Sequence, residues 1–102
     1  MPSVPEALQR LDWEISAARQ QRQSHLKVIH GYGSTGVGGD IRVAVQRRLQ
    51  ELAQAGEIRG CIFGENWSKA DETTWRVLRD RPELKKDADL GRGNQGISVI
   101  LI

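Results

Sequence analysis

Apolar residues recur along this chain at spacings that predict helices in some segments and strands in others. Ser3 is expected to cap a first helix over about residues 4–23, with Pro5 in its first turn. The apolar face of that helix repeats every three or four residues and consists of Val4, Leu8, Leu11, Ile15 and Ala18. The chain therefore begins with an amphipathic helix.

Two further helices are expected. Asp40 is predicted to cap the second helix and Gly56 to end it. Its core face is predicted to be Ile41, Val45, Leu49 and Leu52. The third helix is expected over Asp71–Arg81, with Trp75 and Leu78 on its apolar side, and the charged segment from Pro82 to Gly93 is expected to be irregular.

Three short apolar runs are typical of strands. The run Leu26–Ile29 fits a buried strand of a parallel pair, and Ile58–Phe63 fits a second strand closed by Gly64. The run Gly96–Ile102 is the most β-prone and is expected to form a central or well-covered strand. The first two strands flank a helix, so a right-handed crossover would bring their carboxyl ends to one edge of the sheet. His30 is therefore expected to lie near the segment Gly64–Trp67.

These elements predict one α/β domain over residues 1–102. We expect a small two-layer sandwich with a mixed sheet of three to four strands, two main helices and an extra helical insertion before the last strand. The 15 basic and 13 acidic residues give a net charge of +2, which alone does not indicate a polyanionic partner. The single cysteine, Cys61, excludes an internal disulfide and is expected to be a reduced, buried thiol of a cytoplasmic protein. No apolar run approaches the roughly 20 residues of a membrane span, and no secretion signal is recognisable, so no membrane partner is expected.

The glycine-rich turn after the first predicted strand holds most of the functional signal. Five of the nine residues from Gly31 to Gly39 are glycines, and a helix follows. Such a turn lets backbone amides approach a ligand closely, and the start of a helix adds partial positive charge. The segment predicts an anion site, most often for phosphate.

The sequence around this turn resembles the Smr (small MutS-related) domain family. The resemblance rests on Ile29-His30-Gly31-Tyr32-Gly33, on Ile41-Arg42-x-x-Val45-x-x-x-Leu49, and on Gly93-Asn-Gln-Gly96 before the last strand, and it covers roughly residues 4–63 and 91–102. It implies a fold similar to the C-terminal domain of bacterial translation initiation factor three, with an antiparallel last strand that brings Arg92 and Asn94 to the edge of His30. It also implies DNA or RNA binding, and several such domains are endonucleases, with or without a divalent metal ion.

Two departures from the family pattern bear on function. The family usually begins with a strand that carries Leu-Asp-x-His, and this chain starts at the helix that should follow it; Leu11-Asp12-Trp13-Glu14 has no histidine and lies within a helical pattern. The loop from Ser34 to Asp40 is longer than in the family, and about residues 68–90 form an insertion. The catalytic set implied by the resemblance is therefore incomplete.

The candidate catalytic residues are His30 and Glu65. His30 can exchange a proton near neutral pH, and Glu65 can pair with it or hold a metal ion. The alternative for His30 is a histidine that bonds the backbone and shapes the turn, and for Glu65 a solvated loop carboxylate. Candidate phosphate or nucleic-acid contacts are Gly31, Tyr32, Gly33, Ser34, Thr35, Gly36, Arg42, Asn66, Trp67, Arg92 and Asn94. Arg42 can reach a bound phosphate and Tyr32 or Trp67 can stack on a base or ribose, whereas a surface salt bridge for Arg42 and core packing for Trp67 and Trp75 are the structural alternatives.

Two other functions remain open. The absent first strand would leave a sheet edge that a partner strand or a second copy of the chain completes. The string Gly31-x-Gly33-x-x-Gly36 also matches a dinucleotide fingerprint, with Glu65 as its ribose ligand. That reading needs more strands than the chain offers, and Gly38 and Gly39 are expected to delay the helix; a Walker loop lacks its Gly-Lys-Ser or Gly-Lys-Thr ending.

Overall fold

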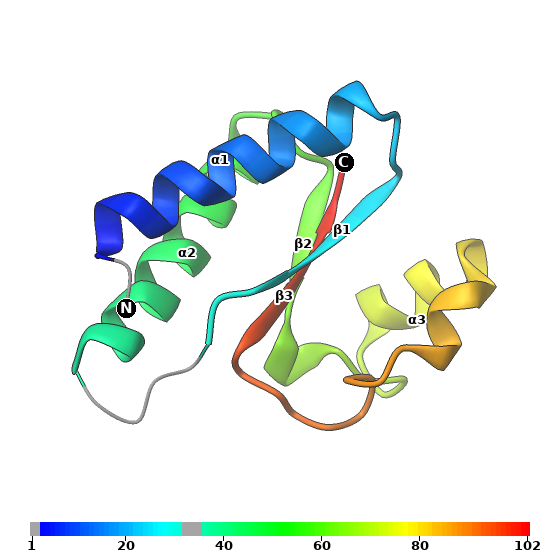
Figure 1. The fold of residues 1–102 in the computed structure, drawn as a ribbon. Coiled ribbons are helices and arrows are strands. Elements are labelled where there is room, and N and C mark those ends of the chain that lie inside the picture. The colour runs from blue at the N-terminus through cyan, green and yellow to red at the C-terminus, as the bar shows by residue number, and fades with distance from the viewer. Residues whose placement is uncertain (1–2, 32–35) are drawn as a thin grey trace.

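The computed structural model describes residues 3–31 and 36–102. Within these residues the chain forms three α-helices, three strands and two short 3-10 helices, in the order α1 (Val4–Gln20), β1 (His25–Ile29), α2 (Gly36–Gln54), β2 (Gly60–Phe63), η1 (Gly64–Asn66), α3 (Glu72–Asp80), η2 (Pro82–Lys86) and β3 (Ile97–Leu101). Figure 1 shows how the helices and strands are arranged. Every helix and strand expected from the sequence is present. The charged segment after α3, expected to be irregular, contains η2.

The three strands form one sheet in the order β1-β3-β2, and both neighbouring pairs are antiparallel. The sheet is therefore not mixed, and the expectation that the first two strands form a parallel pair is wrong. β1 and β2 do run in the same direction, because each is antiparallel to the strand between them. Their carboxyl ends consequently lie at the same end of the sheet, as predicted.

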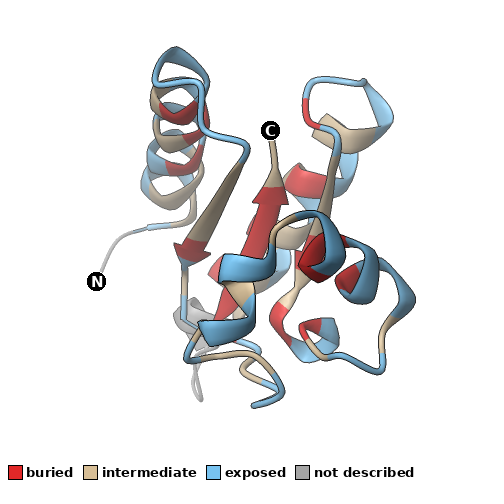
Figure 2. Ribbon diagram, turned by 90° about the vertical axis from the view of Figure 1, so that its right-hand side faces the viewer, coloured by how far each residue is buried: buried red, intermediate tan, exposed pale blue. Residues whose placement is uncertain are grey.

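Helices cover both faces of the sheet. α1 and α2 pack on one face with Val28 and Ile100, and α3 and the following segment pack on the other face with Ile62, Ile97 and Val99. Side chains alternate along β3, so the central strand is buried on both faces (Figure 2). This arrangement confirms the α/β sandwich built on two main helices, and it places the insertion against the face that those helices leave open.

α1 begins as expected and ends earlier. The Ser3 hydroxyl accepts a hydrogen bond from the Glu6 amide at 3.3 Å, and the Glu6 carboxylate accepts one from the Ser3 amide at 3.4 Å. The two hydrogen bonds form a capping box. The helix ends at Gln20 rather than near residue 23. Arg22 takes a positive φ of 55° there, and the Gln23 amide closes the turn on the Ala18 carbonyl at 3.0 Å.

α2 begins at Gly36, four residues before the expected cap, so Asp40 lies inside the helix and does not cap it. Glycine is tolerated where helices start because it adopts helical and non-helical conformations with little penalty. The predicted core face is confirmed. Ile41, Val45 and Leu49 are buried and Leu52 is half-buried.

The orientation of α3 differs from the prediction. Asp71 caps the helix by accepting the Thr74 amide at 2.9 Å, but the buried residues are Thr74, Val77 and Leu78, while Trp75 is 53% exposed. The Thr74 hydroxyl donates to the Asn66 carbonyl at 2.7 Å, so this polar residue is buried with its hydrogen bond made. The helix is turned to bury Thr74, and this turn exposes Trp75.

Cys61 is a free thiol and half-buried, and burial raises its pKa. Across residues 3–31 and 36–102, none of the helices combines the length and the apolar character needed to cross a membrane.

Candidate functional site

Three segments that are distant in sequence meet at one end of the sheet, which we call the His30 end. The amides of His30 and Gly31 donate to the Gly96 carbonyl at 2.9 and 3.0 Å. Gly64 follows β2 and lies against the same turn, since a Cβ on Gly64 would overlap the Asn94 carbonyl oxygen. The predicted convergence of His30 with the segment after β2 is therefore confirmed.

Both ring nitrogens of His30 are engaged. Nδ1 lies 2.7 Å from the Gly31 carbonyl oxygen, which only accepts, so Nδ1 carries the proton. Nε2 lies 3.0 Å from the hydroxyl of Ser98, which is fully buried in β3. In the neutral ring this hydroxyl donates to Nε2, so His30 is fixed between the turn and the central strand.

The surroundings of His30 favour its neutral form. Burial is the largest influence and lowers its pKa below the usual 6.5, and the positive charge of Arg42 acts in the same direction. Hydrogen bonds with the backbone of Gly31 and Ile97 and the charge of Glu65 oppose this shift without cancelling it. Arg42 and Glu65 are thus electrostatic neighbours of the histidine, as the sequence suggested.

Glu65 is not hydrogen-bonded to His30. Its carboxylate oxygens accept from the Gln46 side chain of α2 at 3.4 and 3.5 Å, and the residue is exposed. The two candidate catalytic residues therefore share a neighbourhood without forming a hydrogen-bonded acid–base pair. This geometry supports positioning of the His30 turn more directly than proton transfer.

The structure places some of the candidate binding residues at accessible positions and does not describe others. Arg42 is half-buried on the first part of α2, Gly31 is exposed with a φ of +76°, and Asn66 and Arg92 are exposed. Gly36 begins α2. The residues Tyr32, Gly33, Ser34 and Thr35 lie outside the described part of the chain.

Asn94 and Trp67 have structural roles. The Asn94 side chain donates to Asp89 at 2.9 Å and accepts the Gly96 amide at 2.8 Å, so it shapes the turn on which His30 rests. Trp67 is only 1% exposed, packs in the core beneath α3 and donates its Nε1–H to Asp87 at 3.0 Å. Of the two readings of Trp67 from the sequence, core packing is therefore confirmed and stacking on a ligand is wrong.

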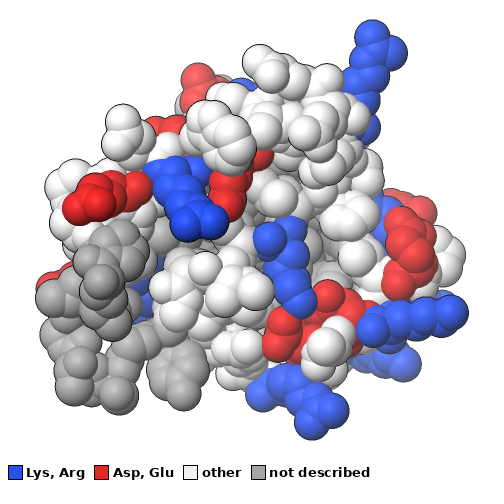
Figure 3. Space-filling model, viewed as in Figure 1, with Lys and Arg blue, Asp and Glu red and all other residues white. Residues whose placement is uncertain are grey.

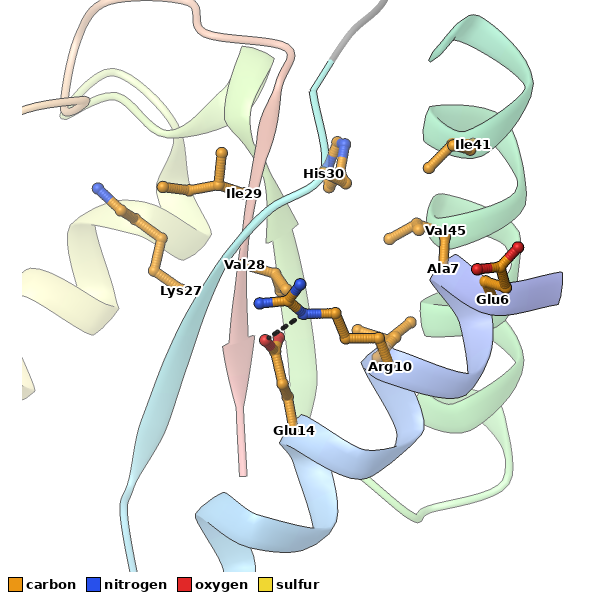
Figure 4. A pocket seen from close by; sticks show the side chains of 11 residues that line it. Glu6, Ala7, Arg10, Glu14, Lys27, Val28, Ile29, His30, Ile41 and Val45 are labelled. Atoms are coloured by element: carbon orange, nitrogen blue, oxygen red, sulfur yellow. Dashed lines mark hydrogen bonds and ion pairs between the residues drawn. The ribbon is translucent and has the colours of Figure 1, made fainter. Parts of the chain in front are cut away.

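A groove runs beside β1 under the first half of α1 (Figure 4). Its volume is about 390 Å³, His30 lies at one end, and Glu6, Arg10 and Glu14 of α1 line its rim. Buried apolar side chains form its floor: Leu11, Val28, Ile41 and Val45.

The groove follows the outer edge of β1, which has no strand beside it within residues 3–31 and 36–102 and which we call the free edge of the sheet. The Ser24 carbonyl accepts from the Ile102 amide and the His30 amide donates to the Gly96 carbonyl, just beyond the two ends of β3. By the antiparallel alternation, the backbone groups of Lys27 and Ile29 therefore point away from β3. Ile29 is 77% exposed.

Sequence reasoning missed Ser98, Gln46 and Lys27. Ser98 is the only hydroxyl residue in the apolar run 96–102, and this isolation was the available signal. Lys27 is likewise the only charged residue in the apolar run 26–29. Its amine forms ion pairs with Asp87 at 2.9 Å and with Asp89 at 2.6 Å. Gln46 is one of several polar residues in the second predicted helix, and nothing in the sequence distinguished it as a partner of Glu65.

No three His, Cys, Asp or Glu side chains within residues 3–31 and 36–102 are grouped so that they could hold a metal ion. The chain matches no protein-family model, no curated protein and no solved structure. Function must therefore be argued from the site itself.

Proposed function

We propose that this chain is an Smr-like domain that binds the sugar–phosphate backbone of DNA or RNA at the His30 end. The observation that carries the proposal is the convergence of the His30–Gly31 turn, Arg42 and the Asn94–Gly96 turn at one end of the sheet. Arg42 contributes a permanent positive charge, and the adjacent start of α2 contributes a partial one. Phosphate is the group that such a combination recognises best.

The geometry favours binding over cleavage as the primary activity. His30 is held neutral, both of its nitrogens have partners, and Glu65 is bonded to Gln46. For His30 to move a proton to or from a phosphodiester, Nε2 would first have to leave Ser98. Endonuclease activity is therefore the further outcome to be tested, with a divalent metal ion as an added reagent.

The test measures binding and cleavage together. Labelled single- and double-stranded DNA and RNA are titrated with the protein at two salt concentrations, with and without divalent metal ion, and the strands are then sized on a gel. Arg42→Ala is expected to weaken binding about tenfold and to reduce the salt dependence by about one phosphate contact. Arg59→Ala is the matched control, because Arg59 is exposed and lies before β2, at the opposite end of the sheet.

Each result has one meaning. Equal behaviour of Arg42→Ala and Arg59→Ala, or no binding by the wild type at low salt, would reject the His30 end as a backbone site. Cleavage that His30→Ala abolishes while binding is retained would make the domain an endonuclease.

The free edge of β1 favours a second candidate, which is completion of the sheet by a partner strand or a second copy. The outward backbone groups of Lys27 and Ile29 are a hydrogen-bonding template, and the apolar floor of the groove can receive alternate side chains of an added strand. Ile29→Lys places a charge on this edge and is expected to abolish any concentration-dependent increase in mass measured by light scattering. A wild type that stays monomeric over the whole range and captures no extended peptide would remove this candidate.

The nucleotide-binding alternative loses its structural basis. α2 begins at Gly36, so the delay expected from Gly38 and Gly39 is not observed. A dinucleotide fold nevertheless needs parallel neighbouring strands, and both strand pairs in the described sheet are antiparallel.

A further inference from the structure

The outer side of α3 and η2 carries an exposed aromatic ring surrounded by positive charge. A hollow of about 330 Å³ is lined by Lys69, Trp75, Leu78, Arg79 and Lys85. Leu78 is buried and forms the floor, while the other four side chains are exposed. Figure 3 shows Lys and Arg side chains, interspersed with carboxylates, projecting from the side of the molecule where Figure 1 places α3.

The Trp75 ring is held in place and remains accessible. The Arg79 guanidinium lies 5.3 Å from the ring centroid, which orients the indole by a cation–π contact. Trp75 is nevertheless 53% exposed. Trp75 is not among the residues of the core cluster beneath α3, and the exposed part of its apolar surface is available to a ligand.

The charges beside the ring are available as well. Across the part of the chain that the structure describes, neither Lys69 nor Lys85 forms an ion pair. The Arg79 side chain is 3.6 Å from that of Asp80, with both groups mostly exposed, so this pair only partly offsets its charge. Three cations therefore line one hollow together with the Trp75 ring, and among the described residues only Arg79 of the three is paired with a carboxylate, that of Asp80.

We propose that this surface binds single-stranded nucleic acid, with a base stacked on Trp75 and the flanking phosphates bound by Lys69, Arg79 and Lys85. The ligand must combine a flat aromatic group with closely spaced negative charges, and single-stranded nucleic acid carries both in every nucleotide. A duplex keeps its bases stacked on one another, so an unpaired strand fits this surface better. The inference rests on the proposed nucleic-acid function and adds to it a strand type and a second contact surface.

The experiment compares two labelled probes by fluorescence anisotropy: a short oligothymidylate and an abasic oligomer with the same number of phosphates. Trp75→Ala is expected to weaken binding of oligothymidylate about tenfold and to leave binding of the abasic oligomer unchanged. Trp75→Phe keeps a ring and is expected to recover part of the loss. Trp13→Ala is the matched control, because Trp13 is 70% exposed on α1, which covers the opposite face of the sheet.

A second readout follows the ring directly. The chain has three tryptophans, and a Trp13→Phe variant retains two of them, the buried Trp67 and the exposed Trp75. Oligothymidylate is expected to quench the fluorescence of this variant, and the abasic oligomer is not.

The outcomes separate this inference from the proposed function. A loss in Arg42→Ala with none in Trp75→Ala would overturn the Trp75 surface and leave the His30 end standing, and the reverse pattern would support the Trp75 surface alone. An equal loss of both probes in Trp75→Ala would overturn base stacking. Competition by an oligoglutamate peptide that is independent of Trp75 would identify an acidic protein segment as the occupant and overturn the proposal, as would no binding of either probe.

Discussion

The most informative single residue is His30, because its two ring nitrogens connect two distant parts of the chain. One nitrogen closes the turn at Gly31 and the other meets Ser98 in the central strand. The ring thus acts as a spacer between the edge strand and the sheet interior. The surroundings of the ring favour its uncharged form, in which the Ser98 hydroxyl donates to Nε2.

We predict that the pKa of His30 measured by NMR titration lies below 6.5, and that the imidazole is neutral at pH 7. A His25→Gln variant leaves one histidine and so assigns the signal. Because the folded-state pKa is lowered, the unfolded chain binds more protons below pH 6.5, so the free energy of unfolding decreases as the pH falls from 6.5 through the folded-state pKa. A titration midpoint at or above 6.5 would contradict the observed burial of the ring.

Tryptophan shows how far residue type alone can mislead. The sequence predicted Trp75 on the apolar side of its helix, and the structure exposes it; for Trp67 the sequence left ligand stacking and core packing open, and the structure confirms core packing. The deciding contact is the hydrogen bond from Thr74 to the Asn66 carbonyl, which turns a polar residue inward and its neighbour Trp75 outward. A helical pattern read from apolar residues cannot include a buried threonine whose partner lies in another turn.

At the scale of elements, the three strands and the covered position of β3 were predictable, and the pairing of β1 and β2 with β3 was not. In the run 96–102, apolar residues would lie on both faces of a strand. This pattern is typical of a strand that is covered on both sides. The order of strands depends instead on pairing across long stretches of chain. Val28 lies opposite Ser98, and no local pattern near either residue reports that pairing.

The close approach of η1 to the turn before β3 makes Gly64 a sensitive position. We predict that Gly64→Ala lowers the free energy of unfolding by about 1–3 kcal/mol or more, because the added Cβ would collide with backbone atoms that have little room to move. Gly60→Ala is the control, since its Cβ would meet only Leu101 Cδ1 at 3.8 Å, and it is expected to change stability by less than about 1 kcal/mol. Urea unfolding measures both, and similar values for the two variants would refute the contact.

At the scale of the whole molecule, a polar network joins the insertion to the sheet. Lys27 on β1 binds Asp87 and Asp89, Trp67 donates to Asp87, and Asn94 donates to Asp89. This network ties the α3 layer to the same Asn94–Gly96 turn that receives the His30 amide. The sequence predicted the helical segment before β3, but it held no signal for the lysine and the two aspartates that connect this segment to the sheet.

Burial of the network would raise the pKa of Asp87 and lower that of Lys27, yet the hydrogen bonds and opposite charges outweigh it. The pKa values of Asp87 and Asp89 are lowered, for Asp89 chiefly by its hydrogen bond from Lys27, and the pKa of Lys27 is raised. The carboxylates therefore contribute stability that is present above pH 3.8 and is lost as the pH falls through their folded-state pKa values. The contribution of Lys27 is present below pH 10.5 and is lost as the pH rises through its folded-state pKa.

We predict that Lys27→Met lowers the free energy of unfolding near neutral pH by about 1–3 kcal/mol, since it leaves two neighbouring carboxylates without their cation. The cost should lie below that of a fully buried pair because the three side chains remain 16–27% exposed.

Arg10→Met is the control, because it removes a cation from a pair whose arginine is 81% exposed, and its expected cost is less than about 0.5 kcal/mol. Urea unfolding followed by tryptophan fluorescence should show the wild type and Lys27→Met converging as the pH falls from 3.8 through the lowered folded-state pKa values of Asp87 and Asp89. A difference between them that does not change with pH would mean that the lysine acts through packing of its alkyl chain and not through its charge.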